Sequence, residues 1–245
     1  MNNKLGAGYV GDVRDFNNIK SFVRVSGELI NLAPLRVGIG REPPLGAAVD
    51  NTFLRLRRGE EDIPYIPGST LKGVLRSYFE QLARSKYPDL HDPWDEKKIS
   101  EEVRENEANF CVICGTFGST KVASHVRVFD SYPLEKVSTN VKTSVGIDRE
   151  FMAARPGILY TEEFVEPNYR WSFKMDIINI AFPPSESSDE RSTLLMETLR
   201  ALKLGLLNFG ARKSVGFGQL QLKEARWVRY VMKDGHLEEE GSGTL

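Results

Sequence analysis

The stretch that decides the fold is IPYIPGSTLKGVLRSYFEQL, residues 63–82. A Pro-Gly turn at 67–68 leads into apolar residues at helical spacing, which predicts an amphipathic helix with one buried face. These apolar residues are Leu71, Val74, Leu75, Tyr78, Phe79 and Leu82. Ser69 or Thr70 is expected to cap the first turn, because its hydroxyl can accept a hydrogen bond from a free N–H group.

Two cations, Lys72 and Arg76, lie on the other side of this helix. A solvated helix face would be the ordinary explanation. Because the helix begins at a Pro-Gly turn, however, its free N–H groups and the positive end of its dipole lie beside both cations. We therefore predict that Ser69, Lys72 and Arg76 bind a phosphate group.

Length and composition indicate a globular protein. The 245 residues suffice for one large domain or two small ones, and 40 % of them are hydrophobic. Lys and Arg total 33 against 34 Asp and Glu, so overall charge does not indicate nucleic acid, although a local basic surface still can. No run approaches the roughly 18 apolar residues of a membrane span, and the N-terminus has no apolar signal core. A cytoplasmic protein without a membrane segment is expected.

The order of expected elements favours an α+β fold. The sequence predicts a strand at 22–32, a helix at 71–82, strands at 124–132 and 170–182 and a helix at 195–206. A last strand follows, to about residue 232. Two helices on one face of an antiparallel sheet form the ferredoxin-like arrangement, which is also that of the RNA recognition motif. The aromatic RNA-binding signature of that motif is absent, so any RNA must be bound by loops.

The sequence predicts a single domain over residues 19–232. Three long insertions interrupt it, at about 33–62, 86–123 and 138–167. The ends, residues 1–18 and the acidic tail 233–245, are rich in polar and small residues and are expected to be flexible.

The insertion at 138–167 is expected to form a hairpin. Phe151 and Met152 would lie near its tip, either as a local hydrophobic clasp or as a wedge that separates bases. Arg149 and Arg155 flank this apolar pair and would meet phosphates.

Two cysteines, Cys111 and Cys114, argue against a disulfide scaffold. Their spacing is that of half a zinc site, but two reduced, buried cysteines would explain it equally well. His91 and His125 are the candidate third ligands. A fourth would have to be a carboxylate, a water or a residue that the pattern does not mark. Any zinc here would be structural.

The glycine-rich stretch FGARKSVGFGQLQL, residues 209–222, is the second candidate phosphate site. A flexible turn is the simpler interpretation. Glycines such as Gly210 and Gly216 also let a ligand approach the backbone closely, and Arg212 and Lys213 supply positive charge.

Four segments, in this order, carry a resemblance to a known family. PYIPGSTLKGVLRS (64–77) and GARKSVGFGQLQL (210–222) resemble the RAMP superfamily of CRISPR-associated proteins. Between them, CVICGTFGS (111–119) and the segment 141–167 are similar to the backbone subunit of type III (Csm-like or Cmr-like) effector complexes. The resemblance covers about residues 20–225, and the family also supplies a zinc-ligating histidine at the position of His91.

The resemblance implies a subunit that stacks on copies of itself and other effector subunits along CRISPR RNA. Its thumb-like hairpin would enter the duplex of guide and target RNA. In catalytic members an aspartate cuts the target RNA with a divalent metal such as Mg²⁺ or Mn²⁺. LGAAVDNTFLR (45–55) matches that loop and Asp50 the aspartate, although Thr52 stands where proline is usual.

Asp50 also has ordinary interpretations, as a loop acid or a turn former beside Asn51. A lone carboxylate would have to hold a metal or position the attacking 2′-hydroxyl. One alternative is therefore a structural RNA-binding module with an inert loop. Another is a guide-processing ribonuclease, but His91, His125 and His236 lie far from Asp50 in the sequence, which disfavours a histidine acid–base mechanism.

Overall fold

The computed structural model describes residues 9–10, 16–38, 40, 49–104, 110–185 and 189–245. Six elements form its core: β2 (Ser21–Asn31), α1 (Gly68–Lys86), β6 (Val126–Val128), β9 (Arg170–Ile178), α4 (Glu190–Lys203) and β11 (Gln219–Lys233). The core strands pair antiparallel in the order β11-β2-β9-β6, with the short β10 (Leu207–Asn208) beside β11. This is the ferredoxin-like order of fourth, first, third and second strand, so the predicted α+β fold is confirmed.

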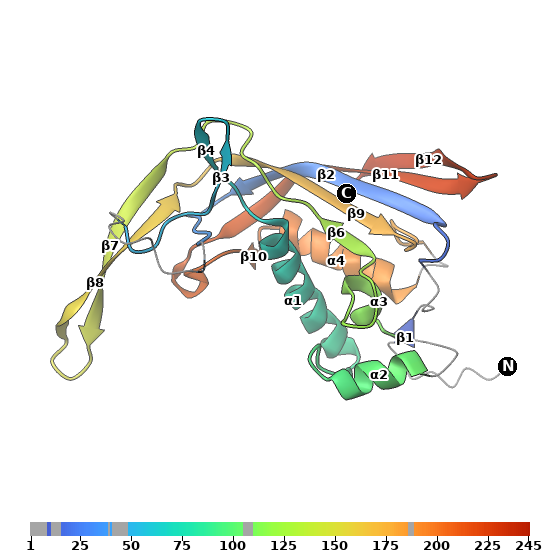
Figure 1. The fold of residues 1–245 in the computed structure, drawn as a ribbon, viewed down its shortest axis with the longest axis horizontal. Helices are drawn as coiled ribbons and strands as arrows, with labels where there is room; N and C mark the ends of the chain where they lie inside the picture. Colours follow the sequence, from blue (N-terminus) through green and yellow to red (C-terminus); the bar gives the residue numbers. More distant parts are fainter. Residues whose placement is uncertain (1–8, 11–15, 39, 41–48, 105–109, 186–188) are drawn as a thin grey trace.

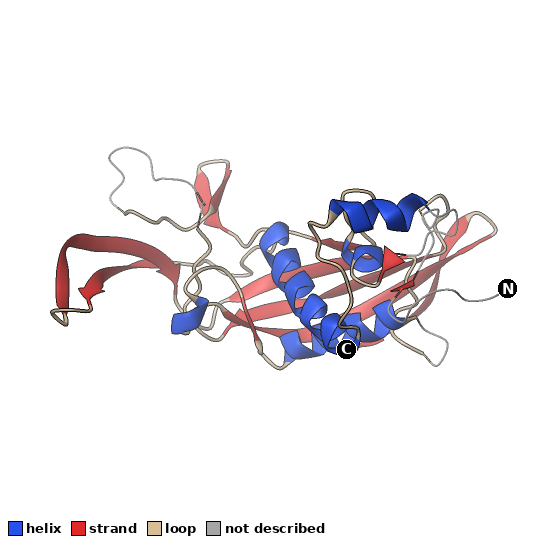
Figure 2. Ribbon diagram, turned by 90° about the horizontal axis from the view of Figure 1, so that it is seen from below, coloured by secondary structure: helices blue, strands red, loops and turns tan. Residues whose placement is uncertain are grey.

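Helices α1 and α4 cover the same face of this sheet (Figures 1 and 2). Alternate residues of β2, among them Val23, Val25 and Leu29, are buried on that face. From α1, the apolar stripe that includes Leu71 and Phe79 packs into the same core. Side chains return to the same face every two residues in a strand and about every 3.6 residues in a helix. The spacing of apolar residues therefore decides which faces of β2 and α1 meet.

The first turn of α1 differs from the prediction, because neither Ser69 nor Thr70 caps it. Pro67 precedes the helix and no side chain caps it there. Asp130 Oδ1 instead accepts a hydrogen bond from the Gly68 N–H at 2.7 Å. A Cβ at Gly68 would lie 2.4 Å from the Val128 carbonyl oxygen, so this turn packs directly on the end of β6.

The first and third insertions contain hairpins. β3 (Arg55–Arg58) pairs with β4 (Glu61–Pro64) in the first. In the third, β7 (Thr139–Asp148) pairs with β8 (Ala153–Val165), as predicted, and this long hairpin projects away from the core (Figure 1).

The second insertion is more regular than predicted. It contains α2 (Glu96–Arg104), β5 (Phe110–Cys111) and the single-turn α3 (Cys114–Phe117). A charged stretch of this insertion forms α2, whose Ile99 is buried in the core. Charge alone does not prevent a helix when one apolar side chain anchors it.

Part of the C-terminal tail, which was expected to be flexible, forms a strand. β12 (His236–Thr244) pairs with β11, and the ring of Trp227 lies against Gly243, where an added Cβ would be 3.0 Å from the indole. The small residues that suggested a flexible tail thus make room for an aromatic ring. At the other end β1 (Tyr9–Val10) pairs with β5, while residues 1–8 and 11–15 lie outside the described chain. No helix within the described ranges is long and apolar enough to cross a membrane.

Candidate functional site

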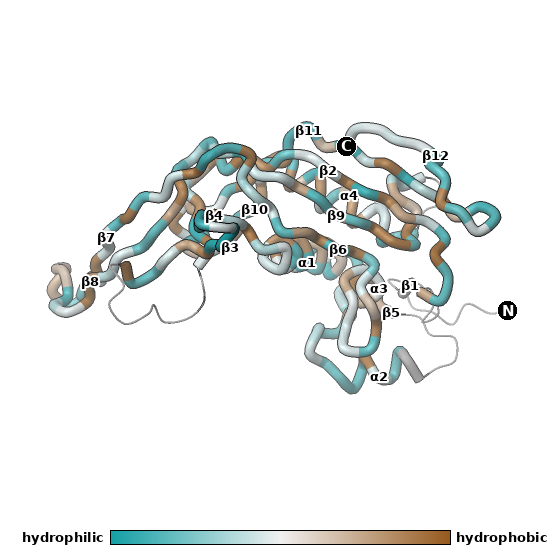
Figure 3. Tube along the Cα trace, turned by 45° about the horizontal axis from the view of Figure 1, so that its top comes forward, coloured by the Kyte–Doolittle hydropathy of each residue, from teal (hydrophilic) through white to brown (hydrophobic). Residues whose placement is uncertain are grey.

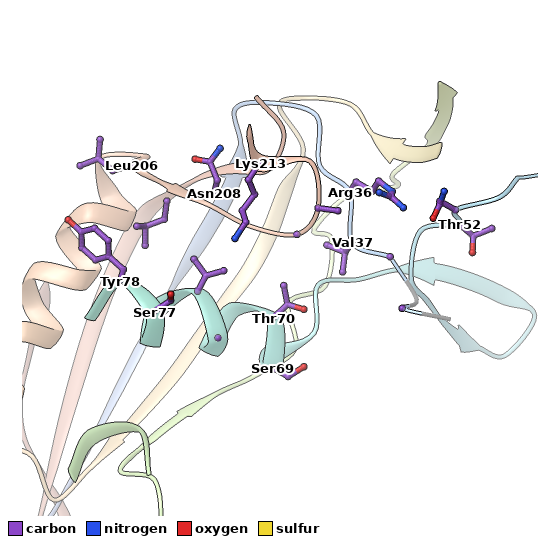
Figure 4. Close-up of a pocket in the computed structure, with 18 of the residues that line it drawn as sticks. Arg36, Val37, Thr52, Ser69, Thr70, Ser77, Tyr78, Leu206, Asn208 and Lys213 are labelled. Atoms are coloured by element: carbon purple, nitrogen blue, oxygen red, sulfur yellow. The ribbon is translucent and has the colours of Figure 1, made fainter. Parts of the chain in front are cut away.

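A groove of about 1090 Å³ lies between α1, the glycine-rich loop and the segment after β2. Figure 4 shows Thr70 and Ser77 of α1 on the side of the helix toward Lys213, with Arg36 and Thr52 at one end of the groove, and Ser69 also lines it. Asp50 and Gly210 line it as well. The groove therefore brings together predicted site residues from three segments that are far apart in the sequence.

The first turn of α1 contributes free backbone donors to the groove. The Gly68 N–H is used by Asp130 and that of Leu71 by the Pro67 carbonyl, but within the described chain no residue accepts a hydrogen bond from the N–H of Ser69 or Thr70. This turn also holds no acidic side chain. Free N–H groups at the positive end of a 19-residue helix make this wall suitable for a phosphate.

The glycine-rich loop supplies the opposite wall, and its residues have different roles. Lys213 is exposed and points from the loop toward α1 (Figure 4). A Cβ at Gly210, where φ is +76°, would lie 2.1 Å from the Arg36 carbonyl oxygen. Gly210 is therefore needed for packing of the loop against the chain, whereas Gly216 has open space around it and a φ of +85°.

Arg212 turns away from the groove toward the base of the β7–β8 hairpin. Its guanidinium donates to the Tyr160 hydroxyl at 2.6 Å and lies 3.4 Å from Glu162 Oε2. Arg36 pairs with the other oxygen of Glu162 at 2.9 Å. The buried Glu162 thus links the glycine-rich loop, the groove and the hairpin. Arg36 lines the groove, was not predicted from the sequence, and has its charge paired with Glu162.

Lys72 and Arg76 do not line the groove and lie on the flank of α1 that faces Ser124 and Gly118. The Lys72 ammonium donates to Ser124 Oγ at 2.8 Å, and burial lowers the pKa of Lys72. Arg76 pairs with Glu80 at 2.7 Å and donates to the Gly118 carbonyl at 3.2 Å. Both cations therefore have partners within the protein.

Instead, small residues of α1 face the groove at four-residue spacing. They are Ser69, Gly73 and Ser77, all exposed. A Cβ at Gly73 would meet no atom within 4 Å, so this face is open. The i, i+4, i+8 repeat of small residues was the signal in the sequence that could have identified this face.

Asp50 lies at the edge of the groove, exposed to solvent and held by β8. The N–H and the hydroxyl of Thr161 donate to Asp50 Oδ2 at 2.7 and 2.9 Å. These hydrogen bonds lower the pKa of Asp50, which keeps it ionised at neutral pH. Asp50 is the only carboxylate among the described residues of the groove, so protein groups alone do not form a magnesium site there.

The hairpin tip places the predicted apolar pair in solvent. Phe151 and Met152 are 75 % and 81 % exposed, and Arg149 and Arg155 are exposed beside them. Figure 3 shows hydrophobic stretches along this projecting hairpin, far from the sheet. A clasp would bury the pair, so this exposure favours the wedge interpretation.

A second constellation gathers His91, Glu102, Cys111 and Cys114, whose ligand atoms all lie within 4.8 Å of one another. His91 Nε2 is 2.9 Å from Glu102 Oε1 and 3.7 Å from Cys114 Sγ. His125 lies elsewhere, its ring 4.4 Å from that of Phe16. The cluster therefore includes His91 rather than His125, and Glu102 is a candidate fourth ligand that the sequence pattern did not mark.

The chemistry of the cluster fits a metal ion. His91 Nδ1 lies 2.8 Å from the Asp92 carbonyl oxygen, and donation there leaves Nε2 as the ligand atom. Hydrogen bonds to Cys111 and Glu102 raise the pKa of His91 to about 10, while hydrogen bonds from Cys114 and His91 lower that of Cys111 to about 6 against the effect of burial. Glu102 Oε2 is buried without a partner among the described residues. A cation would neutralise these buried charges and use that oxygen.

A ferredoxin-like core with a basic, amide-lined groove and a projecting hairpin defines a protein suited to bind an extended polyanion. The family model of the RAMP superfamily matches residues 28–221, well over half of the chain, and the chain belongs to this superfamily. No curated protein matches the sequence. Membership indicates a CRISPR-associated RNA-binding subunit.

Proposed function

We propose that this chain is a guide-binding backbone subunit of a type III CRISPR effector complex and cuts guide-paired target RNA at Asp50. The single observation that carries the proposal is the groove, which is lined by the free amides of the first turn of α1, by Lys213 and by Asp50, with the Glu162-paired Arg36 beside them. Phosphate contacts of this kind are independent of sequence, and base pairing with the guide supplies the specificity.

The hairpin tip supports a role between segments of the guide–target duplex. Exposed Phe151 and Met152 would separate neighbouring bases, and Arg149 and Arg155 would contact the phosphates on either side. The hairpin base carries Glu162, which is paired with Arg36 and lies near Arg212, so the wedge and the groove share a rigid support.

Asp50 would act on the 2′-hydroxyl of the target strand. The 2′-hydroxyl gives up its proton to solvent as its oxygen attacks the adjacent phosphorus, the bond from phosphorus to the 5′-oxygen breaks, and the leaving oxygen takes a proton from solvent. Because its pKa is lowered, Asp50 is a weak proton acceptor, and its role is to accept a hydrogen bond and orient the hydroxyl. The divalent ion that the family resemblance implies is supplied as Mg²⁺ or Mn²⁺ in the test.

The test compares the native chain with Asp50→Ala in guide-loaded complex, with complementary target RNA and Mg²⁺ or Mn²⁺. We expect cuts at regular intervals that disappear in Asp50→Ala, with unchanged affinity for the guide. Guide cleavage without target would indicate a processing enzyme. If neither protein cuts, the chain is a non-catalytic binding subunit.

We further propose that the cluster of His91, Glu102, Cys111 and Cys114 holds a structural zinc ion. Zinc commonly takes four ligands of these types at roughly 2.0–2.3 Å, and the cluster is buried between α2, β5, α3 and the chain after α1. Metal analysis of the purified chain should find about one zinc per molecule.

A further inference from the structure

The segment that carries Asp50 is attached to the hairpin strand β8. Beyond the two hydrogen bonds to Oδ2, the Asp50 N–H donates to Thr161 Oγ1 at 3.0 Å. The Thr161 hydroxyl thus accepts from the Asp50 backbone and donates to its carboxylate. The Thr161 side chain therefore fixes both the backbone and the carboxylate of Asp50.

The attachment continues along the next residues. The Asn51 N–H donates to the Thr161 carbonyl at 3.2 Å, and the Glu163 N–H donates to the Asn51 carbonyl at 2.9 Å. The Phe53 N–H donates to Glu163 Oε2 at 2.7 Å. Asp50 is therefore placed by the base of the hairpin rather than by its own loop.

Both Thr161 donors act on the same carboxylate oxygen. In the described part of the chain, no residue donates a hydrogen bond to Asp50 Oδ1, and Asp50 is exposed at the groove. One oxygen is held while the other stays available to a ligand. A carboxylate that must accept a hydrogen bond from a substrate hydroxyl requires this division, because free rotation would lose the aligned geometry.

We propose that Thr161 is the positioning residue for Asp50 and that the hairpin, through β8, sets the geometry of target cleavage. The inference rests on the proposed function. It assigns to the hairpin base a role in the rate of cutting that is separate from the role of its tip in binding.

The test uses guide-loaded complex with saturating target RNA, and measures the single-turnover cleavage rate and target affinity separately. Thr161→Val keeps the N–H donor but removes the hydroxyl, while Thr161→Ser keeps both. Thr143→Val is the matched control, since Thr143 lies directly opposite Thr161 across the hairpin and is exposed. We expect a rate about 10–100-fold lower for Thr161→Val, because misplacement of about 1 Å costs up to about 100-fold. Thr161→Ser and Thr143→Val should stay within about three-fold of the native rate.

A structural readout that needs no activity comes from amide hydrogen exchange of the full chain. The Thr161 N–H donates to Asp50, so Asp50→Ala should accelerate its exchange about 10-fold or more. Unchanged exchange would overturn the attachment itself.

The cleavage outcomes separate this inference from the proposed function. If Asp50→Ala cuts like the native chain, the proposed function fails. If Asp50→Ala is inactive but Thr161→Val cuts at the native rate, only the positioning role fails. A fall in target affinity or assembly that matches the fall in rate would also overturn it, because the hydroxyl would then stabilise the hairpin rather than orient Asp50.

Discussion

The two flanks of helix α1 differ in what they leave available to a ligand. The flank that carries Lys72 and Arg76 is the more charged, yet both cations are engaged with Ser124, Glu80 and the chain at Gly118. The opposite flank, with Ser69, Gly73 and Ser77, carries no charge but is open and faces Lys213. Binding capacity therefore follows unsatisfied donors and open space rather than the number of charges in the sequence.

The engaged flank packs against the chain that follows the cluster of His91, Glu102, Cys111 and Cys114, and loss of the proposed zinc ion is expected to have the largest effect. Glu102→Ala or treatment with a chelator should remove the ion and lower the melting temperature by about 10 °C, because a tightly bound ligand adds about 4 kcal/mol and a domain of this size shifts by roughly 2–4 °C per kcal/mol. Zinc content and thermal unfolding measure this. Glu101→Ala, an exposed neighbour, is the control, and equal zinc content in both variants would contradict the cluster.

A charge placed on the open flank should block the groove. Gly73→Glu adds a bulky anion where no atom lies within 4 Å, so we expect RNA affinity to fall about 30-fold while the melting temperature stays within about 2 °C. Ser85→Glu puts the same charge on α1 outside the groove and should leave affinity within about two-fold. Filter binding with a guide RNA measures both, and equal losses would show that the groove is not the binding surface.

A direct comparison of the two flanks comes from two lysines. Lys213→Ala should weaken RNA binding about five-fold for all sequences. It should also reduce the slope of log affinity against log salt concentration by roughly 0.7 for each phosphate contact that is lost. Lys72→Ala should change RNA affinity less than two-fold and act on stability, because its ammonium is bonded to Ser124. The opposite ranking would return the binding site to the charged flank.

The smallest expected effect is on thermal stability and concerns Glu163 at the base of the hairpin. Burial alone would raise the pKa of Glu163, but hydrogen bonds from Arg55, Thr139 and the Phe53 N–H lower it to about 2 from an ordinary value of 4.5. The carboxylate therefore stabilises the fold fully above about pH 4.5, and this contribution is lost as the pH falls toward about 2. Glu163→Gln should lower the melting temperature by about 2–4 °C at pH 6 and by less at pH 3. Glu150→Gln at the exposed hairpin tip should show no such dependence.

Local pattern predicted the core elements well. The apolar stripe of α1, the alternation in β2 and β9 and the projecting hairpin all appear where the sequence places them. The expected cap on α1 is absent, and residues 236–244 of the tail form a strand, in both cases through contacts with distant residues. Asp130 accepts the hydrogen bond from the Gly68 N–H, and the tail pairs with β11, where the ring of Trp227 lies against Gly243.

The site was predicted in part. Asp50, Ser69, Gly210 and Lys213 do line one groove. Glu102 and Thr161 were missed because neither stands in a recognisable spacing with its partners, which are 9 and 111 residues away. Such pairs become neighbours only after the chain has folded.

Sequence by itself determined the ferredoxin-like order of elements, the superfamily and the hairpin with its apolar tip, because hydrophobic period and turn chemistry act over a few residues. Tertiary structure alone decided which cations remain available, what completes the metal cluster and what holds Asp50. These properties depend on donors, acceptors and space contributed by distant segments, and no local pattern records which of them are already satisfied.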